Sequence, residues 1–210
     1  MKHLIFILGG SCSGKGRYAL EKGDSLYPSG GSVPRKYYLA TAQALDEGMT
    51  ARIEARKKER SADWITLEES IKVPDAFGFL NKRADVVIID CLSLWLSHLL
   101  MIKSDYDILT ETEVLIAAIK RVDFTVIAVS SELGCGFVPA DPVSRLFTDT
   151  LGQMHQTLAA LADEVYFMKA GIPLQLKGGP PPASGSLPAG FVSGGVPLAV
   201  DVPLPFFPPL

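Results

Sequence analysis

Short runs of apolar residues recur along the chain, separated by longer segments in which apolar and polar positions follow a helical spacing. The apolar runs lie at positions 4–8, 37–40, 86–89, 125–129 and 164–168. Polarity does not alternate within them, which is typical of strands that are buried on both faces of a parallel sheet. We therefore expect each run to form a strand of a mainly parallel central sheet.

The segments with helical spacing lie at 17–22, 47–59, 91–102, 110–121 and 143–162. Strands that alternate with helices predict an α/β domain, in which right-handed crossovers place the helices against the sheet. The last segment has the clearest apolar face, because its large apolar residues recur at three- and four-residue steps: Phe147, Leu151, Met154, Leu158 and Leu161.

Two segments interrupt this alternation. Residues 24–34 are rich in Gly, Ser and Pro and predict a loop. From Gly178 onward the composition changes, with nine of the chain's 15 prolines, and prolines exclude a helix interior or a central strand. We therefore predict one domain over 1–177 and a C-terminal extension over 178–210. The extension is either disordered or loosely packed, or an extended polyproline-like segment docked on the domain or on a partner subunit.

Composition narrows the class of protein. The chain has 210 residues, 48% hydrophobic content and a net charge of −3, which fits a soluble, mildly acidic protein and gives no basic excess for nucleic acid. Cys12, Cys91 and Cys135 lie far apart, which argues against a disulfide framework or a zinc site and favours a reducing cytoplasm. We expect no signal peptide in the short run 4–8 and no membrane span.

A glycine-rich segment follows the first predicted strand. Gly9, Gly14 and Lys15 match the phosphate-loop pattern G-x-x-x-x-G-K-[ST], although Gly16 replaces the hydroxyl residue. In such a loop, backbone N–H groups at a helix N-terminus surround a phosphate, and the lysine bridges two phosphates. The alternative is an ordinary glycine turn. Because of the spacing and context we predict a site for ATP or GTP formed by Gly9, Gly10, Ser11, Cys12, Ser13, Gly14, Lys15 and Gly16.

A magnesium ion normally accompanies a nucleotide in such a loop. Gly16 lacks the hydroxyl that would ligate Mg²⁺, although water could take that position. Asp90 ends the apolar run VVIID and is our candidate metal ligand. The alternative for Asp90 is a cap on the following helix.

Other polar residues follow predicted strands at the carboxyl edge of the sheet, where α/β folds place their sites. Glu132 is positioned to accept the proton of a substrate hydroxyl or to orient it; the alternative is a surface residue that begins a loop. Thr41 is a candidate hydrogen-bonding partner for nucleotide or substrate. His98 and His155 are interpreted as hydrogen-bonded core or interface residues. We also assign to the nucleotide site Ala40, Ala42, Arg56 and Glu68.

Several segments resemble one enzyme family: LGGSCSGKGRYA, IIDCLSLWLSHLL and ELGCGFVP occur in its order and spacing. It is the bifunctional adenosylcobinamide kinase / adenosylcobinamide-phosphate guanylyltransferase family of cobalamin biosynthesis, and the resemblance covers residues 1–177. It implies a RecA-like P-loop fold in a homo-oligomer, often a trimer. It also implies phosphorylation of the corrinoid hydroxyl of adenosylcobinamide, followed by GMP transfer from GTP through a guanylylated histidine.

The chain departs from this family's pattern at the residue aligned with that histidine, which is Ala55. Gly16, Gly48, Ser131 and His155 are further departures. Alanine has no nucleophile, so guanylyl transfer is in doubt. Phosphoryl transfer needs only positioning and electrostatic stabilisation, and we expect it to persist at a reduced rate. Two alternatives remain: a non-catalytic nucleotide- or corrinoid-binding relative, and a kinase for another small hydroxylated substrate.

Overall fold

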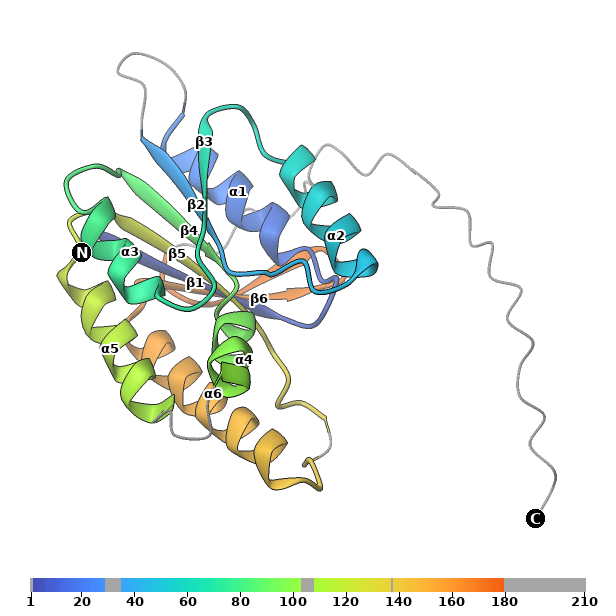
Figure 1. Cartoon of the computed structure of the whole chain (residues 1–210). Helices are drawn as coiled ribbons and strands as arrows, with labels where there is room; N and C mark the ends of the chain where they lie inside the picture. The colour runs from blue at the N-terminus through green and yellow to red at the C-terminus, as the bar shows by residue number, and fades with distance from the viewer. Residues whose placement is uncertain (1, 29–34, 103–107, 137, 180–210) are drawn as a thin grey trace. The chain divides into compact units, whose positions relative to one another are not determined.

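The computed structural model describes residues 2–28, 35–102, 108–136 and 138–179, and these contain one sheet of seven strands (Figure 1). The strand order is β3-β2-β4-β5-β1-β6-β7, and every pair is parallel except the antiparallel pair of β6 with β7. In chain order the strands are β1 (His3–Gly9), β2 (Lys36–Ala40), β3 (Trp64–Glu68), β4 (Val86–Asp90), β5 (Thr125–Ser131), β6 (Glu164–Lys169) and β7 (Ile172–Lys177).

Helices connect the parallel strands. They are α1 (Lys15–Leu26), α2 (Glu47–Lys58), α3 (Val73–Leu80), α4 (Leu92–Ile102), α5 (Ile108–Arg121) and α6 (Pro142–Leu161). One apolar core lies between the sheet and α3, α4, α5 and α6, while α1 packs against the opposite face. Helix α2 buries no residue.

The central strands are buried on both faces, as their unbroken apolar runs predict. In β1, Leu4 and Phe6 contribute to the larger core, whereas Ile5 and Ile7 contribute to the core beneath α1. Strand β5 lies between β1, which leads into the glycine-rich loop, and β4, which ends in Asp90. The predicted α/β class with a mainly parallel sheet is confirmed.

Some local expectations were wrong or incomplete. Residues 24–26 belong to the last turn of α1 instead of the predicted loop, because Asp24 is anchored by an ion pair with the buried Lys36. The sequence reasoning also missed β3, β7 and α3. The residues of the predicted extension beyond Gly179 lie outside the described part of the chain, so the boundary at residue 177 stays a prediction. None of the described helices has the length and apolarity to cross a membrane.

Candidate functional site

The glycine-rich loop lies between the end of β1 and the first turn of α1. Gly9 has φ +151°, and a Cβ there would come within 2.5 Å of the Met168 carbonyl oxygen. Gly14 has φ +94° immediately before the helix begins. Both positions need glycine, and the resulting turn directs backbone toward the N-terminus of α1, where an anion binds favourably.

Lys15 is folded back over this loop. Its Nζ donates hydrogen bonds to the carbonyl oxygens of Gly9 at 2.9 Å and Gly10 at 2.6 Å. Burial lowers the pKa of Lys15, although the neighbouring Cys91 and Asp90 act in the opposite direction. The ammonium group therefore lies in the loop that would enclose a phosphate, as the motif predicts.

Asp90 is buried at the end of β4 and is engaged from two other elements. Its Oδ2 accepts a hydrogen bond from the Tyr38 hydroxyl of β2 and another from Arg56 Nη1 of α2, the latter at 2.5 Å. Burial, followed by the charge of Asp90, raises the pKa of Tyr38, so this hydroxyl stays a donor. The structure thus joins Asp90 to a cationic side chain.

The residues around Asp90 do not fit a magnesium ion in this arrangement. Gly16 offers no hydroxyl, and the carboxylate oxygen nearest to it already pairs with Arg56. The role of Asp90 as a metal ligand stays a prediction.

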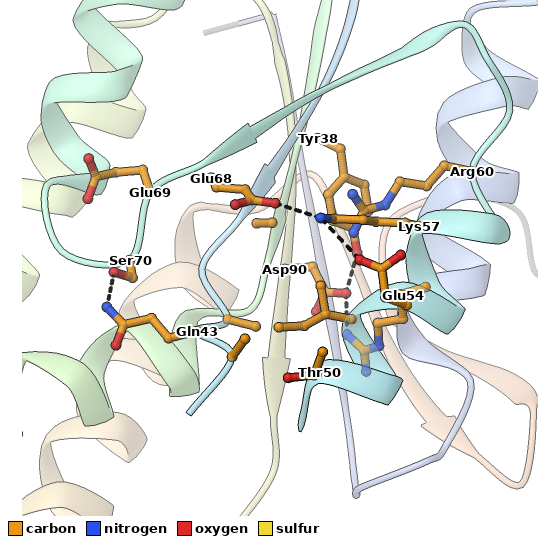
Figure 2. Close-up of a pocket in the computed structure, with 15 residues that line it drawn as sticks. Tyr38, Gln43, Thr50, Glu54, Lys57, Arg60, Glu68, Glu69, Ser70 and Asp90 are labelled. Carbon is orange, nitrogen blue, oxygen red and sulfur yellow. Dashed lines mark hydrogen bonds and ion pairs between the residues drawn. The ribbon is translucent and has the colours of Figure 1, made fainter. Parts of the chain in front are cut away.

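A pocket of about 410 Å³ opens beside Asp90, between α2 and the ends of β2 and β3 (Figure 2). Figure 2 shows Lys57 between Glu54 and Glu68, with its Nζ 3.5 Å and 3.0 Å from their carboxylate oxygens. The Arg60 guanidinium lies 3.6 Å from the centre of the Tyr38 ring. Of the residues assigned to the nucleotide site, the pocket brings together Ala40, Ala42, Arg56, Glu68 and Asp90.

Two residues that the sequence singled out, Thr41 and Ala55, do not line this pocket. Thr41 is fully buried, and its hydroxyl donates to the Cys91 carbonyl and accepts from the Cys91 N–H, both at 2.8 Å. It fixes the ends of β2 and β4 and does not line the pocket. Ala55 is exposed on α2, while the lining includes its neighbours Glu54 and Arg56.

Glu132 follows β5 beside the glycine-rich loop, and its N–H donates to the Gly9 carbonyl at 3.0 Å. Its Oε1 accepts from the Gly134 N–H at 2.6 Å, and its Oε2 lies 3.7 Å from His155 Nδ1. His155 Nε2 is 2.8 Å from Ser130 Oγ. The loop and the candidate proton acceptor are therefore held next to each other.

Both internal histidines are buried, as their apolar surroundings predict. Burial lowers the pKa of His155, with the charge of Glu132 acting against it. Burial likewise lowers the pKa of His98, against a backbone hydrogen bond with Ser70. Neither is an isolated surface group.

Sequence reasoning missed Tyr38 and Arg60 as parts of the site. One available signal was that Tyr38 lies two residues before Ala40 in the same strand, so both point to one face of the sheet. Nothing in the sequence pattern indicated that Arg60 would stack on Tyr38, because α2 has no apolar face to fix its rotation.

The chain is similar to known proteins over most of its length. A family model described as cobinamide kinase / cobinamide phosphate guanyltransferase matches residues 5–176. The bifunctional adenosylcobalamin biosynthesis protein CobP of Pseudomonas aeruginosa is 36% identical over 174 residues, which cover 83% of this chain and 97% of that protein. CobU of Salmonella typhimurium is 33% identical over 187 residues, with coverage of 83% and 99%. A DnaB-like replicative helicase aligns with TM-score 0.46 and 12% identity over 79% of this chain and 46% of its own.

Proposed function

Because this chain belongs to the cobinamide kinase / cobinamide phosphate guanyltransferase family, we propose that it phosphorylates the hydroxyl group of adenosylcobinamide with ATP or GTP. The observation that carries the proposal is that Lys15 Nζ and the Glu132 N–H both donate to the Gly9 carbonyl oxygen, at 2.9 Å and 3.0 Å, so both residues meet at one loop. Lys15 supplies positive charge for the triphosphate, and Glu132 supplies a carboxylate for the reacting hydroxyl.

The phosphate chain would lie across the N–H groups of the loop at the N-terminus of α1. Lys15 would exchange its hydrogen bonds with the Gly9 and Gly10 carbonyls for the phosphate oxygens. Phosphoryl transfer depends mainly on such positioning and electrostatic stabilisation. The pocket beside Asp90 is the proposed place for the remainder of the nucleotide.

Glu132 is the proposed proton acceptor. As the corrinoid hydroxyl oxygen forms its bond to the γ-phosphorus, the bond from that phosphorus to the β–γ bridging oxygen breaks and the nucleoside diphosphate leaves. The hydroxyl proton passes to a Glu132 oxygen. The Gly134 N–H orients this carboxylate through its hydrogen bond to Oε1, and His155 Nδ1 lies 3.7 Å from Oε2.

The second family reaction lacks its nucleophile. Ala55 cannot form a covalent bond to GMP. The nearby amine is Lys57, but its hydrogen bond and ion pair with Glu68 raise its pKa, which keeps it protonated and unreactive. We propose that no covalent GMP–protein intermediate forms on α2, and that GTP serves here as a phosphoryl donor.

We also propose the cellular compartment and the oligomeric state in which the reaction takes place. The three cysteines are all described and none is in a disulfide, which supports a reducing cytoplasm. A homo-oligomer, often a trimer in the family that the chain resembles, is proposed on that resemblance alone.

The test is the incubation of the protein with adenosylcobinamide, Mg²⁺ and either ATP or GTP, with chromatography of the corrinoid. We expect cobinamide phosphate from the wild type, and a loss of roughly 10²–10³-fold in rate for Lys15→Ala, since a charge aimed at the transition state is removed. Lys120→Ala, an exposed change on α5, is the matched control. A protein that binds nucleotide yet leaves the corrinoid unchanged would favour the non-catalytic relative. Turnover only of another hydroxylated compound would favour the other kinase.

A further inference from the structure

The ion pair between Arg56 and Asp90 occupies an unusual position for a nucleotide-binding site. Asp90 ends the strand that carries the acidic residue of P-loop proteins, and its side chain is 2% exposed. Arg56 reaches it from α2 with a side chain that is 48% exposed. The Arg56 side chain therefore reaches from the solvent-exposed side of the pocket to the buried carboxylate of Asp90.

Gly16 makes room for this contact. A Cβ at residue 16 would lie 3.0 Å from Asp90 Oδ2, which is closer than most Cβ contacts in proteins, and 3.9 Å from Arg56 Nη1. A serine or threonine hydroxyl on that Cβ would compete with the guanidinium for the same carboxylate oxygen. The missing hydroxyl and the arginine contact are thus parts of one local arrangement.

We propose that the guanidinium of Arg56 replaces a divalent cation next to Asp90, so that this site binds a nucleoside triphosphate with an arginine as its counter-charge. The inference rests on the proposed function, since it concerns the same nucleotide. Arg56 is then the residue that sets how strongly the binding of a nucleoside triphosphate depends on a divalent cation.

The chemistry of arginine suits this role. A guanidinium carries five N–H donors in a planar fork that matches phosphate oxygens. The ion pair uses Nη1 toward Asp90, and the partial exposure of the side chain leaves other donors accessible from the pocket. Together, Lys15 from α1 and Arg56 from α2 would place two positive charges along the phosphate chain.

The neighbouring cations are engaged elsewhere. Lys57 pairs with Glu54 and Glu68, and Arg60 stacks on the Tyr38 ring and donates to Thr66 Oγ1 at 2.9 Å. Among the cations that line the pocket, Arg56 is the one in contact with the acid at the end of β4.

The test is the dissociation constant of GTP measured by titration calorimetry, once with Mg²⁺ and once with EDTA. For the wild type we expect the two values to agree within about threefold. Arg56→Ala should lose roughly tenfold or more in EDTA, because a charge-assisted hydrogen bond is removed, and Mg²⁺ should restore part of the affinity. Arg56→Lys should retain part of the metal-independent binding, and Gly16→Ser should make binding more dependent on Mg²⁺.

Lys58→Ala is the matched control, because Lys58 is an exposed cation on the same helix and does not line the pocket. Wild-type binding that is lost in EDTA would overturn the inference while leaving the proposed function intact, and so would an Arg56→Ala variant that binds like the wild type in EDTA. A wild type that binds neither GTP nor ATP under either condition would overturn both.

Discussion

Glu132 and Asp90 illustrate what single residues disclose in a sequence. Each follows an unbroken apolar run, and the carboxyl ends of parallel strands meet at one edge of the sheet, so their proximity to the loop could be inferred. The side chains that contact Asp90 could not be inferred in this way. Tyr38 and Arg56 are 52 and 34 positions away along the chain, and no spacing rule links a helix without an apolar face to that strand end.

The role of Glu132 is testable at this scale. Glu132→Gln keeps an oxygen that can accept from the Gly134 N–H but cannot take a proton. We expect kcat for cobinamide phosphorylation to fall by roughly 10²–10⁴-fold, since a general base is lost, with little change in KM for the nucleotide. Steady-state kinetics separate the two constants. Glu113→Gln, an exposed change on α5, is the control, and an unchanged kcat in Glu132→Gln would remove this residue from the mechanism.

At the scale of elements, the buried strands were predictable and the edge elements were not. Strand β3 is a short edge strand that ends in the charged Glu68, and β7 is an antiparallel edge strand in which Pro173 and Gln175 interrupt the apolar residues. Helix α3 contains Pro74 and Gly78 within eight residues, so its helical spacing is weak. Each of these elements depends on the existing sheet or core more than on its own pattern.

One polar contact joins three elements and should be costly to remove. Lys36 of β2 is 1% exposed, and its Nζ lies 2.7 Å from Asp24 Oδ1 of α1. The same oxygen accepts from Trp64 Nε1 of β3 at 3.0 Å. Asp24→Ala leaves the buried ammonium without its carboxylate. Because the Asp24 side chain is 45% exposed, the pair lies between the buried and exposed cases, and we expect a loss of about 2 kcal/mol in the free energy of unfolding by urea.

Two variants calibrate this loss. Asp24→Asn retains an acceptor oxygen but not the charge, so it should cost less than Asp24→Ala. Glu21→Ala removes an exposed pair with Arg17 on the same helix and should change stability by no more than about 0.5 kcal/mol. Equal effects of Asp24→Ala and Glu21→Ala would show that the contact with Lys36 does not stabilise the fold.

At the scale of the whole molecule, the strand order assembles the site. The order β2-β4-β5-β1 makes these four strands neighbours, so their carboxyl ends lie side by side. The residues at those ends come from distant parts of the chain: Ala40, Asp90, Glu132 and Gly9. Strand–helix alternation predicts parallel pairing, but apolar runs of similar composition do not specify which strands are neighbours. The strand order was therefore not predicted from the sequence.

The buried histidines make global stability depend on pH. Burial lowers the pKa of His155 and of His98 from the ordinary value of 6.5, so the unfolded chain takes up protons more readily than the folded one. Stability should therefore be greatest above the unfolded value and fall as the pH decreases through it, by up to about 1.4 kcal/mol per pH unit for each histidine. Urea unfolding at pH 7.5 and about 5.5 measures this slope. His155→Asn should make it shallower, and an identical slope would contradict the assignment.

The central claim is that this chain keeps the phosphoryl-transfer chemistry of its family without the covalent GMP intermediate. The direct measurement is incubation with GTP, Mg²⁺ and adenosylcobinamide, followed by mass analysis of the corrinoid and of the intact protein. We predict cobinamide phosphate, no GDP-cobinamide and an unmodified protein. Formation of GDP-cobinamide or of a GMP–protein adduct would contradict the account, because it would require a nucleophile or a direct transfer that Ala55 and the protonated Lys57 do not provide.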